Sequence, residues 1–531
     1  MTLVQTFFAV RFLTIRQIAY RLLRMVGART RFSPLSLDWY PCSVKASIGL
    51  DGLDHPRYSD GQFRFINRSS SFTGGDWNSP VFNKLWLYNL HYFDWIHELR
   101  DAQTAWIEQW IRENPPFSGN GWEPYPVSLR LNNWIMYFQN TERSPSDEIL
   151  SSMGLQAAFL YNNLEFQHGA NHLLENLIAL KMVSFHLKPS GIARRIDAWL
   201  MSELQGQFLA DGGHYERSPM YHSILLQRMI GLLNVWPRKD QGDMYMLLKS
   251  IVMKAMRWLS IMSVQGQIAL FNDSCYDATP KISSLLTFGQ AVLGCSDTFL
   301  VSDGLHMLGS SGYYRYQNQN YLMIWDGGPL GPDDNLAHAH CDIFSYCLWV
   351  NGEPVVVDSG NYEYIPGQMR AYCRSTAAHN ALTVDNGEQA EMWRSHRVGR
   401  RGRPISVSAM PVAHGAVLEG RHDGFSHFSG APLHERRIEL REKQITVVDR
   451  VISSRRHQSD SFIHCAPDSN IVLDGLTAII ERAGVAVKIL CSHQPILEEG
   501  WFCPEFGIKI QNKIIKITTS DNEMSYIIHI L

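Results

Sequence analysis

Two histidines separated by one residue, His338 and His340, are followed by a carboxylate at Asp358 and a third histidine at His379. Imidazole and carboxylate groups are the usual nitrogen and oxygen ligands of zinc in proteins. On a regular strand, residues i and i+2 share one face, so both members of the pair would point the same way. These residues therefore predict a metal-centred site, with a zinc ion that only ties strands together as an open alternative.

A second group of polar side chains stands at the start of a predicted helix, beside a run of leucines. It contains His168, Asn171, His172, Glu175 and Asn176. Residues four apart lie on one side of a helix, which pairs Asn171 with Glu175 and His172 with Asn176. Either these groups pack one helix against another, or they line a cleft and donate hydrogen bonds to a substrate carboxylate.

The connection over residues 211–222 is dense in side chains that titrate. It contains Tyr215 and Tyr221, two histidines, a glutamate and an arginine. Two glycines end the preceding helix, and Pro219 suits the first turn of the next one. A tyrosine beside an arginine or a protonated histidine has its phenolate favoured, which would make it a base. A solvated polar loop is the alternative.

Hydrophobic periodicity changes near residue 310. Before it, apolar residues recur at helical spacing in the segments 173–182, 196–208, 224–235 and 244–262, with turn signals between them. Such a series of helical hairpins stacks into a solenoid or closes into a toroid.

After residue 310 the apolar residues alternate, as in 437–441, 444–449 and 525–530. We therefore expect an α+β multidomain chain: an N-terminal helical segment (1–55), a helical domain (56–309) and an antiparallel β-sandwich (310–531).

Asn351-Gly352 lies between two apolar runs and predicts a two-residue hairpin turn. That register would place Asp358 opposite Ser345, five residues beyond His340. The chain before Ile343 must then fold back, or a bulge must shift the register, for His340 and Asp358 to share one ion.

Composition excludes several classes of protein. The 531 residues exceed the roughly 250–300 at which single cores stop growing. A net charge of -3 gives no overall basic field, so nucleic acid is not an expected partner. The nine cysteines are scattered and imply no disulfide framework. No segment reaches the roughly 20 apolar residues of a membrane span.

The N-terminal segment is apolar at first and is then interrupted by Arg11, Arg16, Arg21 and Arg24. This pattern predicts an amphipathic helix, packed on the core or lying on a membrane surface. A secretory signal has its positive charge before the apolar stretch, and here the order is reversed. We therefore expect a cytoplasmic location, with the periplasm as the alternative.

At these clusters the chain resembles the heparinase II/III-like family of polysaccharide lyases. The matching stretches are 171–176, 211–222, 338–340, 358–360 and 374–380, with further similarity at 86–92 and 122–130. The resemblance covers most of the chain from about residue 80 to 400. It implies an incomplete (α/α) toroid followed by an antiparallel β-sandwich. It also implies β-elimination on a uronic-acid-containing polysaccharide, which could be a glycosaminoglycan, an alginate or a bacterial exopolysaccharide.

The resemblance implies a role for each matched residue. Asn171 and His172 match the groups that neutralise the uronate carboxylate. Tyr221 matches the catalytic tyrosine, with Tyr215 as the runner-up, and His338 matches the histidine that acts as the base or assists. The implied ligands of a structural divalent metal, usually zinc, are His340, Asp358 and His379, and no organic cofactor is implied. The implied substrate contacts are Tyr88, His91, Trp122, Arg130 and Tyr215. Tyr372 and Arg374 match either substrate contacts or residues that support such contacts.

This assignment divides the histidine pair, because His338 would face the substrate while His340 turns to the metal. It therefore predicts irregular backbone over 338–340.

Two other functions stay open. One is a metal hydrolase, since His338-Ala-His340-Cys-Asp342 copies a His-x-His-x-Asp pattern, although Ile343 stands where a further histidine is normal. The other is a non-catalytic glycan-handling protein of polysaccharide biosynthesis. The sugar, the cleavage mode and the oligomeric state stay open as well.

Overall fold

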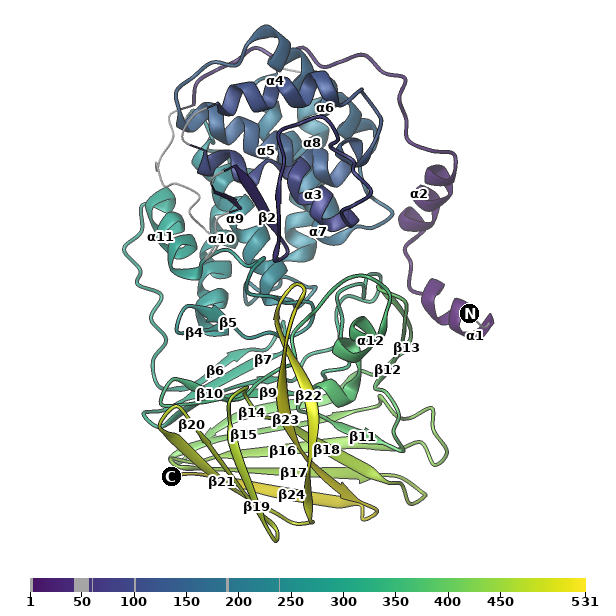
Figure 1. The fold of residues 1–531 in the computed structure, drawn as a ribbon, viewed down its shortest axis with the longest axis vertical. Coiled ribbons are helices and arrows are strands. Elements are labelled where there is room, and N and C mark those ends of the chain that lie inside the picture. Colours follow the sequence, from purple (N-terminus) through teal and green to yellow (C-terminus); the bar gives the residue numbers. More distant parts are fainter. Residues whose placement is uncertain (1–2, 43–56, 60, 100–101, 188–190, 238) are drawn as a thin grey trace.

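The computed structural model describes residues 3–42, 57–59, 61–99, 102–187, 191–237 and 239–531. A helical half and a β half are stacked along the long axis of the molecule (Figure 1). Each half contains a large hydrophobic core. The last helix of the first half ends at Leu293 and the first strand of the second begins at Gly304, so the β half begins before residue 310.

The helical half is an incomplete (α/α) toroid, as the sequence predicts. The helices predicted over 173–182, 196–208, 224–235 and 244–262 are confirmed as α7 to α10. The helices of this half are α3 (Lys84–Tyr92), α4 (Gln103–Glu113), α5 (Pro124–Asn140), α6 (Asp147–Asn162), α7 (Ala170–Ser184), α8 (Gly191–Gln207), α9 (Pro219–Asn234), α10 (Asp243–Met262) and α11 (Ile282–Leu293).

A small three-stranded sheet precedes the toroid helices. Its strands are β1 (Tyr58–Ser59), β2 (Gln62–Phe65) and β3 (Arg68–Ser71), and all its pairings are antiparallel. Phe63 and Phe65 are buried, which anchors the sheet to the aromatic core of the toroid. Ile66 and Asn67 form the tip of the β2–β3 hairpin, with φ angles of 47° and 57°.

The β half is an antiparallel sandwich built mainly from three sheets. The strand orders are β10-β9-β8-β7-β6, β11-β18-β23-β22 and β14-β15-β16-β17-β24-β21-β20-β19. The strands of the first sheet are β6 (Gly304–Leu308), β7 (Tyr313–Gln317), β8 (Tyr321–Asp326), β9 (Tyr346–Val350) and β10 (Glu353–Val356). Those of the second are β11 (Leu382–Val384), β18 (Ser459–His464), β22 (Pro495–Glu505) and β23 (Ile508–Thr519). Those of the third are β14 (Pro404–Val412), β15 (Gly415–His422), β16 (Leu433–Leu440), β17 (Gln444–Ile452), β19 (Asn470–Asp474), β20 (Thr477–Arg482), β21 (Val485–Cys491) and β24 (Glu523–Ile530). The predicted strands over 437–441, 444–449 and 525–530 correspond to β16, which ends at Leu440, and to β17 and β24.

The predicted Asn351-Gly352 hairpin joins β9 to β10, and both turn residues have positive φ. A register shift follows between Pro354 and Val356. Before β9 the chain folds back: Phe344 has a φ of 67°, and the Ser345 backbone N–H donates to the Asp342 carbonyl at 2.9 Å. The prediction of irregular backbone over 338–340 is confirmed, because these residues lie in a turn and a coil.

The N-terminal segment forms two helices, α1 (Leu3–Val10) and α2 (Ile15–Met25). The prediction of a helical segment extends to residue 55, and residues 43–56 lie outside the described part. In α2 the polar side faces the protein: Gln17 is buried, while Ile15 and Leu22 are 87% and 61% exposed. Tyr20 packs against the core of the helical half, so the core-packed alternative holds for α2 only in part, and the membrane-surface alternative stays a prediction. Within the described ranges, no helix has the length and apolar content to cross a membrane.

Candidate functional site

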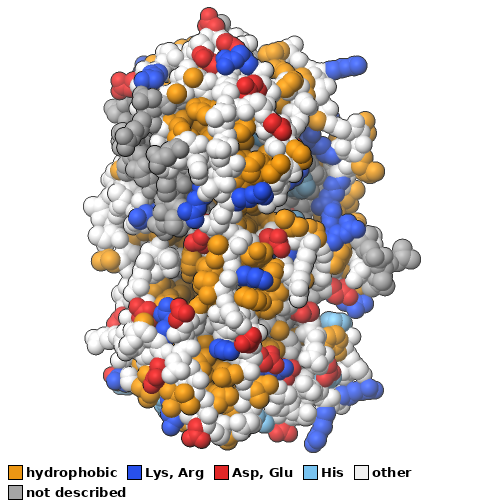
Figure 2. All heavy atoms as spheres, viewed as in Figure 1, with side chains coloured by type: hydrophobic (Ala, Val, Ile, Leu, Met, Phe, Trp, Pro, Cys, Tyr) orange, Lys and Arg blue, Asp and Glu red, His pale blue; other side chains and the backbone are white. Residues whose placement is uncertain are grey.

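A cavity of about 720 Å³ lies between the helical and β halves. The helical half lines it with side chains from the β2–β3 hairpin and from α3, α5, α7 and α9, and the β half lines it with residues 338, 362–366, 396 and 506–507. On the face drawn in Figure 2, apolar, basic and acidic side chains intermingle at mid-height, where the halves meet. Of the expected site residues, Asn171, His172, Tyr221, His338 and Tyr88 line this cavity.

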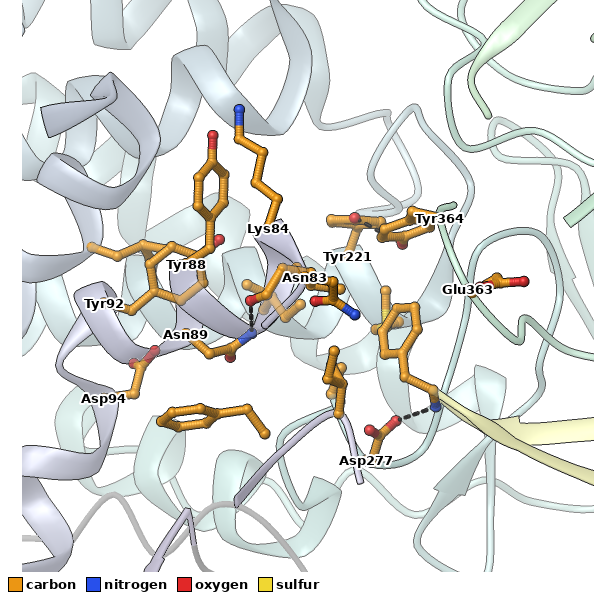
Figure 3. A pocket seen from close by; sticks show the side chains of 18 of the residues that line it. Asn83, Lys84, Tyr88, Asn89, Tyr92, Asp94, Tyr221, Asp277, Glu363 and Tyr364 are labelled. Atoms are coloured by element: carbon orange, nitrogen blue, oxygen red, sulfur yellow. Dashed lines mark hydrogen bonds between the residues drawn. The ribbon is translucent and has the colours of Figure 1, made fainter. Parts of the chain in front are cut away.

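Tyr221 stands in the first turn of α9, in a position that its neighbours fix. The Ser218 side chain accepts a hydrogen bond from the Tyr221 backbone N–H at 3.2 Å, and Pro219 occupies the first turn, as predicted. The Tyr221 ring centroid lies 4.0 Å from that of His338. Its hydroxyl lies 2.9 Å from that of Tyr364, and the two tyrosines point toward one another in Figure 3. Burial raises the pKa of Tyr221 above its ordinary value, so its resting form is the neutral phenol.

Asp273 joins both members of the histidine pair. Its Oδ2 lies 2.9 Å from His338 Nδ1, and its Oδ1 lies 2.9 Å from His340 Nε2. Arg370 donates to both oxygens. Burial raises the pKa of Asp273, but Arg370 and the two histidines outweigh it and hold that pKa well below its usual range. An ionised carboxylate only accepts hydrogen bonds, so His338 carries its proton on Nδ1 and leaves Nε2 as an acceptor.

The backbone around the pair is held from both halves. The His340 N–H donates to the Asn272 side chain at 2.9 Å, and the Asp273 N–H donates to the His338 carbonyl at 3.1 Å. Arg374 Nε donates to the Ala339 carbonyl at 3.0 Å. These contacts hold the backbone in place of strand pairing. His338 and His340 can therefore lie in different surroundings although only one residue separates them. His338 lines the cavity and His340 is fully buried.

Asn171 and His172 begin α7 on the cavity wall. The His172 Nδ1 atom lies 3.1 Å from Glu165 Oε1, and its ring lies 4.3 Å from that of Tyr125. Burial lowers the pKa of His172, but the Glu165 carboxylate outweighs it, so the pKa is raised overall. The side chain is 34% exposed, which leaves the ring accessible from the cavity.

The expected metal ligands lie behind this wall. His379 Nδ1 lies 2.8 Å from Asp358 Oδ2, and the rings of His340 and His379 are 5.3 Å apart. His340 Nδ1 and His379 Nε2 are buried and have no hydrogen-bond partner among the described residues. These two nitrogens fit zinc, each on a ring oriented by a carboxylate. The Asp358 carboxylate is engaged by His379 and the Gly360 N–H, and no three His, Cys, Asp or Glu side chains of the described ranges form a metal-binding group.

Two expected substrate contacts are corrected by the structure. His91 and Arg130 are both 0% exposed and do not reach the cavity. Arg130 donates to Gln156, to the Gly121 carbonyl and to the His91 carbonyl, and it stacks 3.7 Å above the Trp110 ring. These contacts stabilise the toroid.

Four other expected residues also lie off the cavity wall. Trp122 is buried beside a second hollow, which Arg21 and Arg24 of α2 also line. Tyr215 is half-buried, and the hydroxyl of Tyr372 accepts a hydrogen bond from the Trp501 backbone N–H in β22. Arg374 donates to the Ala339 carbonyl and so supports the backbone between the two histidines.

Sequence reasoning missed Asp273, and gave no role to Tyr364 and Glu216. Asp273 follows the apolar run 268–271, and a lone carboxylate after such a run is a signal of a buried charge that needs partners. Glu216 is 2% exposed and its Oε1 lies 3.9 Å from His338 Nε2. Burial raises the pKa of Glu216. Tyr364 carries no motif, and only folding brings it to Tyr221.

A helical toroid joined to an antiparallel sandwich is the fold that this chain shares with solved heparinase structures. Two family models match the chain: "Heparinase II/III N-terminus" over residues 82–287 and "Heparinase II/III-like, C-terminal" over residues 302–528. The chain belongs to the heparinase II/III-like family.

Individual relatives agree with this assignment. A heparin-sulfate lyase of Pedobacter heparinus is 24% identical over 364 residues, which span 58% of this chain and 53% of that protein. The solved structure of heparinase III has a TM-score of 0.67 at 16% identity, covering 97% of this chain and 89% of its own. The chondroitin AC lyase of Streptomyces coelicolor A3, solved with chondroitin sulphate, has a TM-score of 0.51 at 8% identity. The match covers 81% of this chain and 70% of that chain. These structural likenesses concern the fold.

Proposed function

We propose that this protein is a polysaccharide lyase that cleaves a uronic-acid-containing polysaccharide by β-elimination. The observation that carries the proposal is the contact between Tyr221 and His338, whose rings lie 4.0 Å apart on one cavity wall. Asn171 and His172 line the same cavity from α7. The relatives named lyases of heparin sulfate and chondroitin give the proposal its substrate class, an acidic glycosaminoglycan.

The first requirement of the reaction is neutralisation of the uronate carboxylate. Removing the C5 proton develops negative charge on that carboxylate, and fixed donors stabilise it most when they are in place beforehand. His172 supplies a cation, because Glu165 raises its pKa, and Asn171 supplies an amide donor. We assign both to the carboxylate.

The second requirement is a base for the C5 proton. His338 Nε2 is the free acceptor of a ring whose Nδ1–H is held by Asp273 at 2.9 Å. A carboxylate behind a histidine fixes its tautomer and stabilises the imidazolium that forms on proton transfer. We assign the base to His338 and a positioning role to Asp273.

The third requirement is an acid for the departing O4. The neutral phenol of Tyr221 is a donor, and its raised pKa opposes the phenolate that a base would need. In the complete step, His338 takes the C5 proton and the C5–H electron pair forms the C4–C5 double bond. The C4–O4 bond breaks, and O4 receives the Tyr221 proton. Tyr364, whose hydroxyl lies 2.9 Å from the Tyr221 hydroxyl, orients it. Transfer of the proton gained by His338 to the Tyr221 phenolate restores both groups.

We also propose a structural zinc held by His340 and His379, with Asp358 as a third ligand or as the partner that orients His379. Such an ion would stabilise the β half beside the cavity by fixing buried groups from separate segments. The unpartnered ring nitrogens of both histidines support it.

The test of function is incubation with heparan sulfate, chondroitin sulfate, alginate and an unsulfated uronate polymer. Elimination produces an unsaturated uronate with strong ultraviolet absorbance. Reducing ends without that absorbance would indicate a hydrolase instead, and binding without either product would indicate a glycan-handling protein.

A further inference from the structure

Two hairpins, one from each half of the chain, meet at one side of the cavity. The tip of β2–β3 and the tip of β22–β23 approach each other at mid-height in Figure 1. Asn67 Nδ2 donates to Glu505 Oε2 at 2.8 Å and to the Phe506 carbonyl at 3.1 Å. Residues 64–68 and 506–507 all line the cavity, so the tip contact is part of its wall.

The β22–β23 tip is itself fixed to the site. The Phe506 N–H donates to Asp277 Oδ1 at 3.1 Å, and the Gly507 N–H donates to the Tyr362 carbonyl at 2.9 Å. The Phe506 ring packs edge-on against Tyr364, with centroids 5.1 Å apart. Tyr364 is hydrogen-bonded to Tyr221. The Phe506 ring therefore connects the contact between the tips to this tyrosine pair.

The N-terminal helices tie the two halves together at another place, at the right edge of Figure 1. In α2, Gln17 Nε2 donates to Asp334 of the β half at 3.2 Å, while Arg24 donates to Asn163 of the helical half at 2.9 Å. Phe12, between α1 and α2, lies 4.0 Å from the Arg401 guanidinium of β13 (Arg397–Arg401). This second tie opposes a hinge motion that would separate the hairpin tips.

A polymer that binds along an open cleft can be cut at internal bonds, because any segment can enter from the side. Where the cleft is bridged, a chain must enter by its end. From the bridged cavity we infer that this protein cleaves its substrate from a chain end, releasing small unsaturated products. The inference rests on the proposed lyase function and adds the cleavage mode to it.

The bridged side also has the charge that a terminal acidic sugar needs. Arg64 and Arg68 are exposed side chains on the cavity wall next to the tip. Arg64 donates to Asn67 Oδ1 at 2.8 Å, which positions the tip residue and places a guanidinium beside it. Arginine binds carboxylate and sulfate oxygens in a planar, bidentate manner. These two side chains are suited to hold the anionic groups of the last sugar.

The cleavage mode is measured by following the size of long heparan sulfate chains, or of the polymer that gives turnover, while unsaturated product accumulates. Cleavage from an end leaves the polymer peak near its starting size while small products rise. An early fall of polymer size, before small products accumulate, would overturn the inference and leave the lyase function standing. Absence of unsaturated product on every polymer would contradict the lyase function instead.

Hairpin variants test whether the contact between the tips is the cause of cleavage from a chain end. The double variant Asn67→Gly/Glu505→Ala removes the side-chain bridge, and glycine tolerates the left-handed conformation at position 67 (φ 57°). We expect internal cleavage to rise at least severalfold relative to release of small products. Asn351→Gly is the matched control, since Asn351 also occupies a hairpin tip at positive φ (50°) but does not line the cavity. An unchanged cleavage pattern in the double variant would contradict the role of the tips.

A binding measurement tests the inference without turnover. Oligosaccharides capped at one end or the other with a bulky group are titrated against Tyr221→Phe protein. We expect one of the two caps to weaken binding by at least tenfold. Equal affinity for the uncapped and both capped oligosaccharides would show that internal segments are accepted, and would overturn the inference.

Discussion

Asp273 and His338 belong to different halves of the chain, yet Asp273 Oδ2 lies 2.9 Å from His338 Nδ1. The carboxylate is fully buried and is shared with His340 and Arg370. The base that we assign is therefore complete only when the toroid and the sandwich are docked.

Asp273→Asn should lower kcat by about 100-fold or more, because an amide can stabilise the wrong tautomer of His338 and cannot stabilise its cation. The measurement is kcat together with the urea midpoint. Asp449→Asn is the matched control, since Asp449 is an equally buried carboxylate that binds His434 and Arg436 in the β half. Equal losses of kcat in the two variants would mean that Asp273 only stabilises the fold.

Tyr221→Phe should lower kcat by about 100-fold to 10,000-fold with little change in KM, because it removes the proton donor to O4 and keeps the ring that packs on His338. Tyr364→Phe removes only the partner hydroxyl and should cost about tenfold. Steady-state kinetics on one defined oligosaccharide separates the two. A larger loss in Tyr364→Phe than in Tyr221→Phe would exchange their roles.

The pH dependence should report His172. Its folded pKa is raised by Glu165, so the cation is present at low pH and is lost as pH rises through that pKa. kcat/KM should therefore fall on the alkaline side, and Glu165→Gln should move that fall to lower pH. The exposed Glu148→Gln on α6 serves as the control. An alkaline limb that does not move in Glu165→Gln would remove His172 from carboxylate neutralisation.

Arg130→Met should lower the free energy of unfolding by about 3 kcal/mol or more, because it leaves three buried acceptors without a donor. The KM of the folded variant should stay the same, since Arg130 does not reach the cavity. Urea unfolding with parallel kinetics measures both. The exposed Arg112→Met on α4 is the control, and a changed KM with unchanged stability would restore Arg130 as a substrate contact.

The purified protein should contain about one zinc per chain if His340 and His379 hold a structural ion. Chelation and His379→Ala should both remove it and lower the thermal midpoint by several degrees. Metal analysis by mass spectrometry and thermal unfolding provide the readouts. His434→Ala, a buried histidine elsewhere in the β half, should retain the metal, and protein that never contains a metal would contradict the proposal.

Much of the fold followed from periodicity. The four helices α7 to α10 and the Asn351-Gly352 turn were predictable because each depends on neighbours within a few residues. The substrate contacts were less predictable. His91 and Arg130 have residue types typical of binding sites, but the identity of a polar side chain does not reveal whether it faces a cavity or satisfies buried carbonyls.

The sequence by itself determined which residues could do the chemistry, because Tyr221, His338, Asn171 and His172 stand in motifs whose local backbone it also specifies. Only the tertiary structure decided how they work together. Asp273 reaches His338 across 65 residues of chain, and Tyr364 reaches Tyr221 across 143. The meeting of the tips at Asn67 and Glu505 spans 438 residues. Such pairings depend on how the toroid and the sandwich dock, and no pattern within either segment encodes the partner.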